Sequence, residues 1–220
     1  QRAVQKIFKD GEIWVDTSVL LPVIAESLLD PEMRIVSRLL KAAADAGMKL
    51  RVTSGVIEEV ERHINRCLVY VRTPGNYWIG GVPFVFAIYA LSGRNSATFA
   101  SWLENFCGTE RPRDDIGDYL LTEWGIEIHE LTEVAENAPE ALRWEVDRIW
   151  REAHEARRVG GAIEYDSHVI ERLGKHDGEG WRGVIGKRTS GLASELGYTH
   201  WWLTFDKTGR DFEKKLVETL

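Results

Sequence analysis

Residues 13–24 constrain this chain most, because Asp16 is the only charged side chain in an otherwise apolar, hydroxyl-bearing or proline-containing run. A carboxylate in such surroundings is costly unless hydrogen-bond donors or a cation compensate it. Residues 13–15 predict a buried strand, and the sequence after Asp16 predicts a turn and then a helix that begins near Pro22. Asp16 therefore ends a strand, either as an ordinary helix cap or as part of a site.

The rest of the chain alternates strand and helix signals. Further strands are expected at 49–54, 126–131 and 200–205, with helices at 1–8, 30–46, 55–71, 114–124 and 140–158 and another beginning near 164. Residues 174–191 contain many glycines and are interpreted as a loop. This order predicts an α/β fold, with three α/β/α layers around a central, mostly parallel sheet.

Length and composition are typical of one globular domain spanning residues 1–220. No linker divides the chain, and no run approaches the ~20 apolar residues of a membrane span. The two cysteines, Cys67 and Cys107, have no metal-ligand spacing and are expected to be reduced thiols of a cytoplasmic protein. The net charge of −7 disfavours broad adhesion to nucleic acid but leaves room for a local basic groove.

Four acidic residues occupy comparable positions at strand ends or helix starts: Asp16, Glu59, Asp166 and Asp206. Carboxyl ends of parallel strands share one edge of a sheet, where ligands bind. Gathered carboxylates repel one another unless cations such as Mg²⁺ or Mn²⁺, which prefer oxygen ligands, neutralise them. Two such ions about 4 Å apart are a known device for phosphodiester hydrolysis. Taken singly, each acid also fits a helix cap or a solvated helix face.

The sequence around these acids resembles that of the PIN-domain family of metal-dependent ribonucleases. The similar segments are "IWVDTSVLL", "VTSGVIEEVERHI", "EYDSHVIERL" and "ASELGYTHWWLTFDKT". They cover roughly 12–65 and 160–212. Residues 70–130 match nothing in the family pattern and are interpreted as a helical insertion that enlarges a PIN-like domain.

The resemblance implies that Asp16, Glu59, Asp166 and Asp206 are the catalytic acids and hold Mg²⁺ or Mn²⁺. Thr17, Ser18 and Thr204 would orient a carboxylate or a water molecule. Because the sequence after Asp166 departs from the family pattern, Glu164 and Asp177 remain competitors for the third position. The implied reaction is hydrolysis of an RNA phosphodiester by a metal-activated water.

The expected substrate contacts lie in the glycine-rich segment, at Lys175, Arg182, Lys187 and Arg188. Cations bind the phosphates of single-stranded RNA, and a nearby ring such as Trp181 can stack on a base. The same segment also fits a solvated loop. The resemblance leaves open whether the chain is a toxin with an antitoxin partner, a processing enzyme or a domain of a larger protein, and whether it forms a homodimer; no membrane is implied.

Two other functions compete with a ribonuclease. The first is a catalytically silent PIN-like domain that binds or scaffolds within a larger protein. The second is a haloacid-dehalogenase-type phosphatase, which needs a second Asp two residues after the first. Because Ser18 stands at that position, the phosphatase is disfavoured.

Overall fold

The computed structural model describes residues 11–75, 77–78, 80–160, 167–188, 197–209 and 211. The expected helix at 1–8 and two of the candidate acids, Glu164 and Asp166, lie outside these residues. No helix in the described ranges is long and apolar enough to cross a membrane.

The centre of the molecule is a four-stranded, all-parallel sheet with the order β3-β2-β1-β4. Its strands are β1 (Glu12–Val15), β2 (Lys49–Val52), β3 (Ile126–Ile128) and β4 (His200–Leu203). In the central strand, Ile13 is paired with Leu50 on one side and with Trp201 on the other. The expectation of an α/β fold with a parallel sheet is confirmed.

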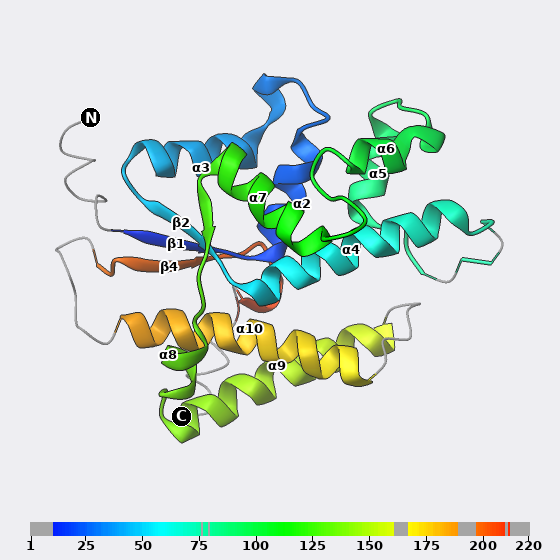
Figure 1. Cartoon of the computed structure of the whole chain (residues 1–220). Helices are drawn as coiled ribbons and strands as arrows, with labels where there is room; N and C mark the ends of the chain where they lie inside the picture. The colour runs from blue at the N-terminus through cyan, green and yellow to red at the C-terminus, as the bar shows by residue number, and fades with distance from the viewer. Residues whose placement is uncertain are drawn as a thin grey trace.

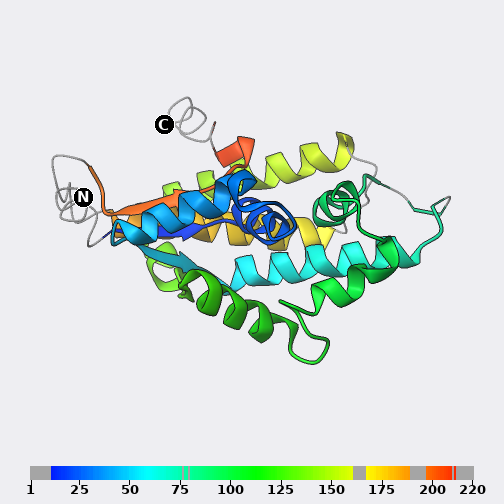
Figure 2. The same ribbon diagram turned by 90° about the horizontal axis from the view of Figure 1, so that it is seen from above.

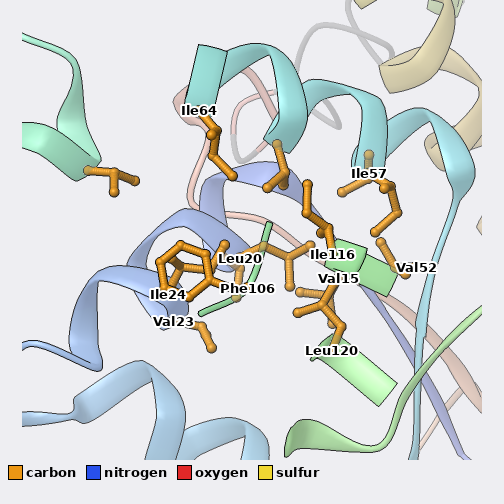
Figure 3. Close-up of a cluster of buried hydrophobic side chains, with 14 of the residues drawn as sticks. Val15, Leu20, Val23, Ile24, Val52, Ile57, Ile64, Phe106, Ile116 and Leu120 are labelled. Atoms are coloured by element: carbon orange, nitrogen blue, oxygen red, sulfur yellow. The ribbon is translucent and has the colours of Figure 1, made fainter. Parts of the chain in front are cut away.

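One face of the sheet carries the main apolar core. The helices around this core are α2 (Thr17–Glu26), α3 (Ile35–Asp45), α4 (Ser54–Arg72), α5 (Phe84–Leu91), α6 (Phe99–Leu103) and α7 (Pro112–Trp124), with 3₁₀ turns η1 (Pro31–Met33) and η2 (Ser96–Thr98). Figure 1 shows α2, α3 and α7 on this side of the sheet. Figure 3 shows Val15 and Val52 meeting Leu20, Ile57 and Leu120 in one continuous cluster. Both cysteines are free thiols.

The opposite face is covered by α10 (Ser167–Lys187), with α8 (Thr132–Glu136) and α9 (Glu140–Gly160) packed against it. Figure 1 shows α3 and α10 on opposite sides of the strands, and in Figure 2, viewed from above, α3 lies in front of the strands and α10 behind them. Trp14 of β1 points to this face, where it packs with Leu131 and Val184. Successive residues of β1 therefore supply both faces, because strand side chains alternate.

The glycine-rich segment after residue 174 is a helix, so its interpretation as a loop was wrong. The glycines are needed for close packing: a Cβ at Gly180 would lie 2.4 Å from the Trp202 ring, and one at Gly183 would lie 2.5 Å from the Leu131 Cβ. Because these glycines have no side chain, the backbone of α10 can approach the sheet and α8 closely.

The helix after Asp16 also begins earlier than predicted. It begins at Thr17, and Pro22 lies inside it, because the Asp16 carboxylate accepts the Thr17 N–H and caps the helix. At the other end of α2, the buried Glu26 carboxylate accepts the backbone N–H groups of Val36 (2.8 Å) and Ser37 (2.7 Å). Asp16 thus caps α2 itself, and Glu26, at the other end of α2, caps the start of α3.

Residues 70–130, expected to form a helical insertion, contribute directly to the central structure. α5 and α6 supply Tyr89 and Phe99 to the main core, and α7 leads through Gly125 into β3. Gly125 adopts a φ of 63°, the left-handed conformation that ends a helix at glycine. The predicted end of this helix is confirmed.

Candidate functional site

Asp16 lies at the carboxyl end of β1 and is almost completely buried. Its Oδ1 accepts the Thr17 N–H at 2.7 Å, and its Oδ2 accepts the hydroxyls of Ser18 and Thr204, each at 2.6 Å. Burial, and then repulsion by the Glu59 carboxylate, raise the pKa of Asp16, while these three hydrogen bonds oppose the rise. The site therefore holds a buried acid in a fixed orientation at an electrostatic cost.

Glu59 reaches the same place from the second turn of α4. The Thr17 hydroxyl donates to Glu59 Oε2 at 2.9 Å, so one threonine links both carboxylates through its backbone and its side chain. The other Glu59 oxygen, Oε1, lies 3.3 Å from Nδ1 of His176 on α10. A carboxylate from the junction of β1 and α2, a carboxylate from α4 and an imidazole from α10 therefore meet at one edge of the sheet.

The α10 backbone can approach this point because α4 begins with a glycine in its first turn. A Cβ at Gly55 would lie 2.8 Å from the His176 ring. The position of His176 beside Glu59 thus depends on close packing between two helices far apart in the sequence.

Asp206, the fourth predicted acid, follows β4 but has a local role. Its N–H donates to Thr204 Oγ1 at 3.0 Å, and its Oδ1 accepts the Thr208 N–H at 2.7 Å. The second contact is typical of the ordinary helix cap considered for this residue. Thr204, two residues earlier, is the residue of this segment whose side chain contacts Asp16.

Among the residues that the structure describes, no three His, Cys, Asp or Glu side chains are grouped so that they could hold a metal ion. Of the four predicted acids, the structure brings Asp16 and Glu59 together. Asp166 lies outside the described residues. Asp177, its competitor, lies on α10 and contacts Nε2 of His154 at 2.8 Å.

A cavity of about 380 Å³ lies between the start of α4 and α10, and His176, the neighbour of Glu59, is part of its lining. We call it the α4–α10 cavity; it is lined by Thr53, Ser54, Gly55, Ile57, Glu58, Arg113, Asp114, Ile128, Glu130, Thr132, Lys175, His176 and Glu179. Buried Glu58 holds arginines from three helices: Arg62 at 2.7 Å, Arg172 at 2.5 Å and Arg113 at 3.6 Å. The lining therefore mixes both charges, with Arg113 and Lys175 beside Glu58, Asp114, Glu130 and Glu179.

The four predicted substrate cations lie along α10 and just after it, and they do not form one group. Lys175 is exposed and lines the α4–α10 cavity. Arg182 is buried against Asp147, and Lys187 lies 3.8 Å from Glu12, at the opposite end of β1 from Asp16. Arg188 donates to the His200 carbonyl of β4 at 2.8 Å. Of these four, Lys175 is the one that lines the same cavity as His176, the neighbour of Glu59.

The sequence analysis did not identify Arg113 as a neighbour of the site. Arg172 and His176 belong to the same basic stretch as Lys175, and they come together because positions 172, 175, 176 and 179 share one helix face. Arg113 comes from α7, within the segment expected to be a helical insertion.

Comparison with known proteins adds no relative: no family model, curated protein or solved structure matches this chain. What the site can do is therefore argued from its own geometry.

Proposed function

We propose that this chain is a PIN-like, Mg²⁺- or Mn²⁺-dependent endoribonuclease that cuts single-stranded RNA. The observation that carries the proposal is the Asp16–Glu59 pair, linked through Thr17 at the carboxyl edge of a parallel sheet. This edge is where ligands bind in parallel α/β folds. Two acids far apart in the sequence meet there, in the order that the sequence pattern led us to expect.

The residues present fit a hard divalent cation. Asp16 and Glu59 supply carboxylate oxygens, and one or two carboxylates with waters and substrate phosphates are a usual Mg²⁺ environment. Burial and the neighbouring negative charge raise the pKa of Asp16, and a cation would relieve that cost. When bound, the ion would supply an activated water and stabilise charge on the phosphate.

The surrounding hydroxyls keep the two acids in place. Thr17 fixes the separation of the carboxylates, and Ser18 and Thr204 hold Asp16 Oδ2. Ser18 is itself positioned by accepting the Phe205 N–H at 2.8 Å, which connects β4 to the start of α2. Outer hydrogen bonds of this kind commonly change metal affinity or activity by about 10- to 100-fold when removed.

Arg113, Arg172 and Lys175 provide the positive charge that an RNA backbone requires. Arg113 and Lys175 line the α4–α10 cavity, and Arg172 contacts the same Glu58 as Arg113. All three residues are exposed, and the two arginines are held in place by ion pairs with Glu58 and Glu61. Phosphate contacts of this type give affinity that falls with salt concentration.

The test is cleavage of a single-stranded RNA by the purified chain with Mn²⁺, compared with Asp16→Asn, Thr17→Val and Asp30→Asn. We expect Asp16→Asn to lose about 100-fold or more of the rate and Thr17→Val about 10- to 100-fold. Asp30→Asn is the matched control, because Asp30 is exposed and its side chain makes no cap hydrogen bond. It should cut like the unaltered chain.

Equal cleavage by Asp16→Asn and Asp30→Asn would show that the activity is a contaminant and would contradict the proposal. A second candidate is a silent RNA-binding domain, which is favoured by the lack of a three-acid group among the described residues. Thermal unfolding separates the two, because a cation site gives Mn²⁺-dependent stabilisation that Asp16→Asn removes. RNA binding without cleavage and without this stabilisation would support the silent domain.

A further inference from the structure

A second cavity, of about 440 Å³, lies on the surface formed by α3 and the end of α7. We call it the α3–α7 pocket; it is lined by Pro31, Arg34, Ser37, Arg38, Lys41, Ala44, Glu123 and Trp124. None of these residues belongs to the Asp16–Glu59 site. α3 and α10 lie on opposite sides of the sheet (Figure 2), so this pocket is separate from the α4–α10 cavity. Its volume is that of a small-molecule site.

The pocket is strongly cationic in a chain whose net charge is −7. Arg34, Arg38 and Lys41 line it against a single acid, Glu123. Arg38 and Lys41 are exposed, and neither forms an ion pair with any residue in the part of the chain that the structure describes. Arg34 is anchored, because its Nε donates to the Leu29 carbonyl at 2.8 Å. Uncompensated cations around a hollow favour an anionic ligand.

A buried hydroxyl in the lining is a second, independent indication of a ligand. Ser37 is 5% exposed, and its Oγ has no hydrogen-bond partner within the described ranges. Its backbone N–H is held by Glu26, so the residue is fixed at the pocket wall. An unpaired buried hydroxyl is unfavourable, and a ligand oxygen at this wall would give it a partner.

The remaining wall is aromatic. Trp124, the last residue of α7, is partly exposed in the pocket and is supported from behind by the main core. An indole face beside arginine and lysine side chains suits a flat base next to a phosphate, because bases stack on aromatic rings. We infer that the α3–α7 pocket binds a nucleotide, with its phosphate at Arg34, Arg38 and Lys41 and its base on Trp124.

This inference does not rest on the proposed nuclease activity, because the two sites share no residue. The nucleotide can be a free mononucleotide or one unit of an RNA strand, since both carry the same phosphate and base. A free mononucleotide would make the pocket a separate ligand site. A unit of RNA would make it a second contact for a long strand.

The test is calorimetric titration of the full chain, in buffer with a chelator, with adenosine 5′-monophosphate, adenosine, inorganic phosphate and a short oligoadenylate. We expect the monophosphate, the oligoadenylate or both to bind more tightly than adenosine or phosphate alone, and to weaken as salt is added. Arg38→Glu/Lys41→Glu should raise the dissociation constant about tenfold or more. Trp124→Leu should weaken nucleotide binding but leave inorganic phosphate unchanged.

The matched control is Lys49→Glu/Arg72→Glu, which reverses two exposed cations outside the pocket and should bind like the unaltered chain. Asp16→Asn should also bind unchanged, whatever it does to cleavage. Tighter binding of the monophosphate identifies a free nucleotide, and tighter binding of the oligoadenylate identifies RNA. No binding of either, or an equal loss in both charge-reversal variants, would overturn the inference.

Discussion

The two faces of the sheet are covered by different chemistry. On the α2 side, one continuous apolar cluster reaches from Val15 to Ile126 and includes a chain of aromatic contacts. On the α10 side, the apolar contacts are split into small groups, around Trp14 and around Trp150. The difference shows that the first face is held mainly by buried apolar area, while the second depends on close backbone approach.

Polar pairs make up for part of the smaller core on the α10 side. Arg182 is buried against Asp147, and His154 contacts Asp177 at 2.8 Å. Such pairs fix geometry but add little net stability, because desolvation offsets their attraction. We therefore expect α8–α10 to open at a lower free energy than the α2 side. Because the candidate site takes His176 from one layer and Asp16 from the other, it depends on both.

The difference in stability between the two layers is tested most directly by truncating one fully buried leucine in each. Leu20 lies in the main core and Leu131 lies beside Gly183 of α10. Leu→Ala changes in cores cost about 2–5 kcal/mol. We expect Leu20→Ala near the upper end and Leu131→Ala near the lower end, because the small cluster around Leu131 has fewer neighbours to lose. Urea unfolding gives both free energies.

Amide hydrogen exchange gives the location of each effect. Leu131→Ala should speed exchange in α8–α10 while the sheet and α4 stay protected, whereas Leu20→Ala should speed exchange everywhere. A larger loss of stability for Leu131→Ala than for Leu20→Ala would show that the α10 side is the stronger layer.

The next effect concerns pH and belongs to the α2 side. Burial, and then the charge of Arg66, lower the pKa of His63 from 6.5 to about 4. Its neutral Nε2 accepts the Val85 N–H at 3.3 Å, in the first turn of α5. Because the folded-state pKa is depressed, this stability is fully present above about 6.5 and is lost as pH falls toward about 4.

The expected loss across that range is on the order of 3 kcal/mol. Denaturant unfolding at several pH values should show the slope, and His63→Gln, which keeps an acceptor without a proton equilibrium, should reduce it. An unchanged slope in His63→Gln would assign the pH dependence to other groups.

The smallest effect tests the glycines of α10. Gly180→Ala should destabilise the chain by about 1–3 kcal/mol, because the added Cβ would lie 2.4 Å from the Trp202 ring. Gly174→Ala is the matched control on the same helix, since its nearest atom would lie 3.8 Å away. It should stabilise the chain by about 0.5–1 kcal/mol through helix propensity. Thermal unfolding of both variants measures the contrast, and the same sign for both would contradict it.

The fold was predictable where local signals and packing agree. The short strands, the helix ends at Gly47 and Gly125 and the parallel order all follow from periodicity and turn residues. The loop prediction was wrong for 174–187, because glycine is interpreted locally as a loop signal, whereas here it serves contacts with residues far away in the sequence. Pro22 misplaced the start of α2 for a related reason: the cap made by Asp16 outweighs the preference of proline for the first turn.

Of the candidate site, the Asp16–Glu59 pair was predictable from the sequence, whereas the contacts of His176 and Arg113 were not. The meeting of Asp16 and Glu59 follows from the rule that parallel strands present their carboxyl ends at one edge. The meeting of Glu59 with His176 depends on how closely α10 approaches Gly55, which no pattern in the sequence encodes. Arg113 depends likewise on the path of α7.

The carboxylates at the two ends of α2 limit how its length can change. Asp16 lies in the candidate functional site, and Glu26 holds Ser37 in the wall of the α3–α7 pocket. The two carboxylate-bearing residues are about 15 Å apart along the axis of the ten-residue helix α2. Deleting one residue between them would turn Glu26 by about 100° and withdraw it from α3. The number of residues in α2 is therefore as constrained as its buried side chains, because an inserted or missing residue would disturb both sites at once.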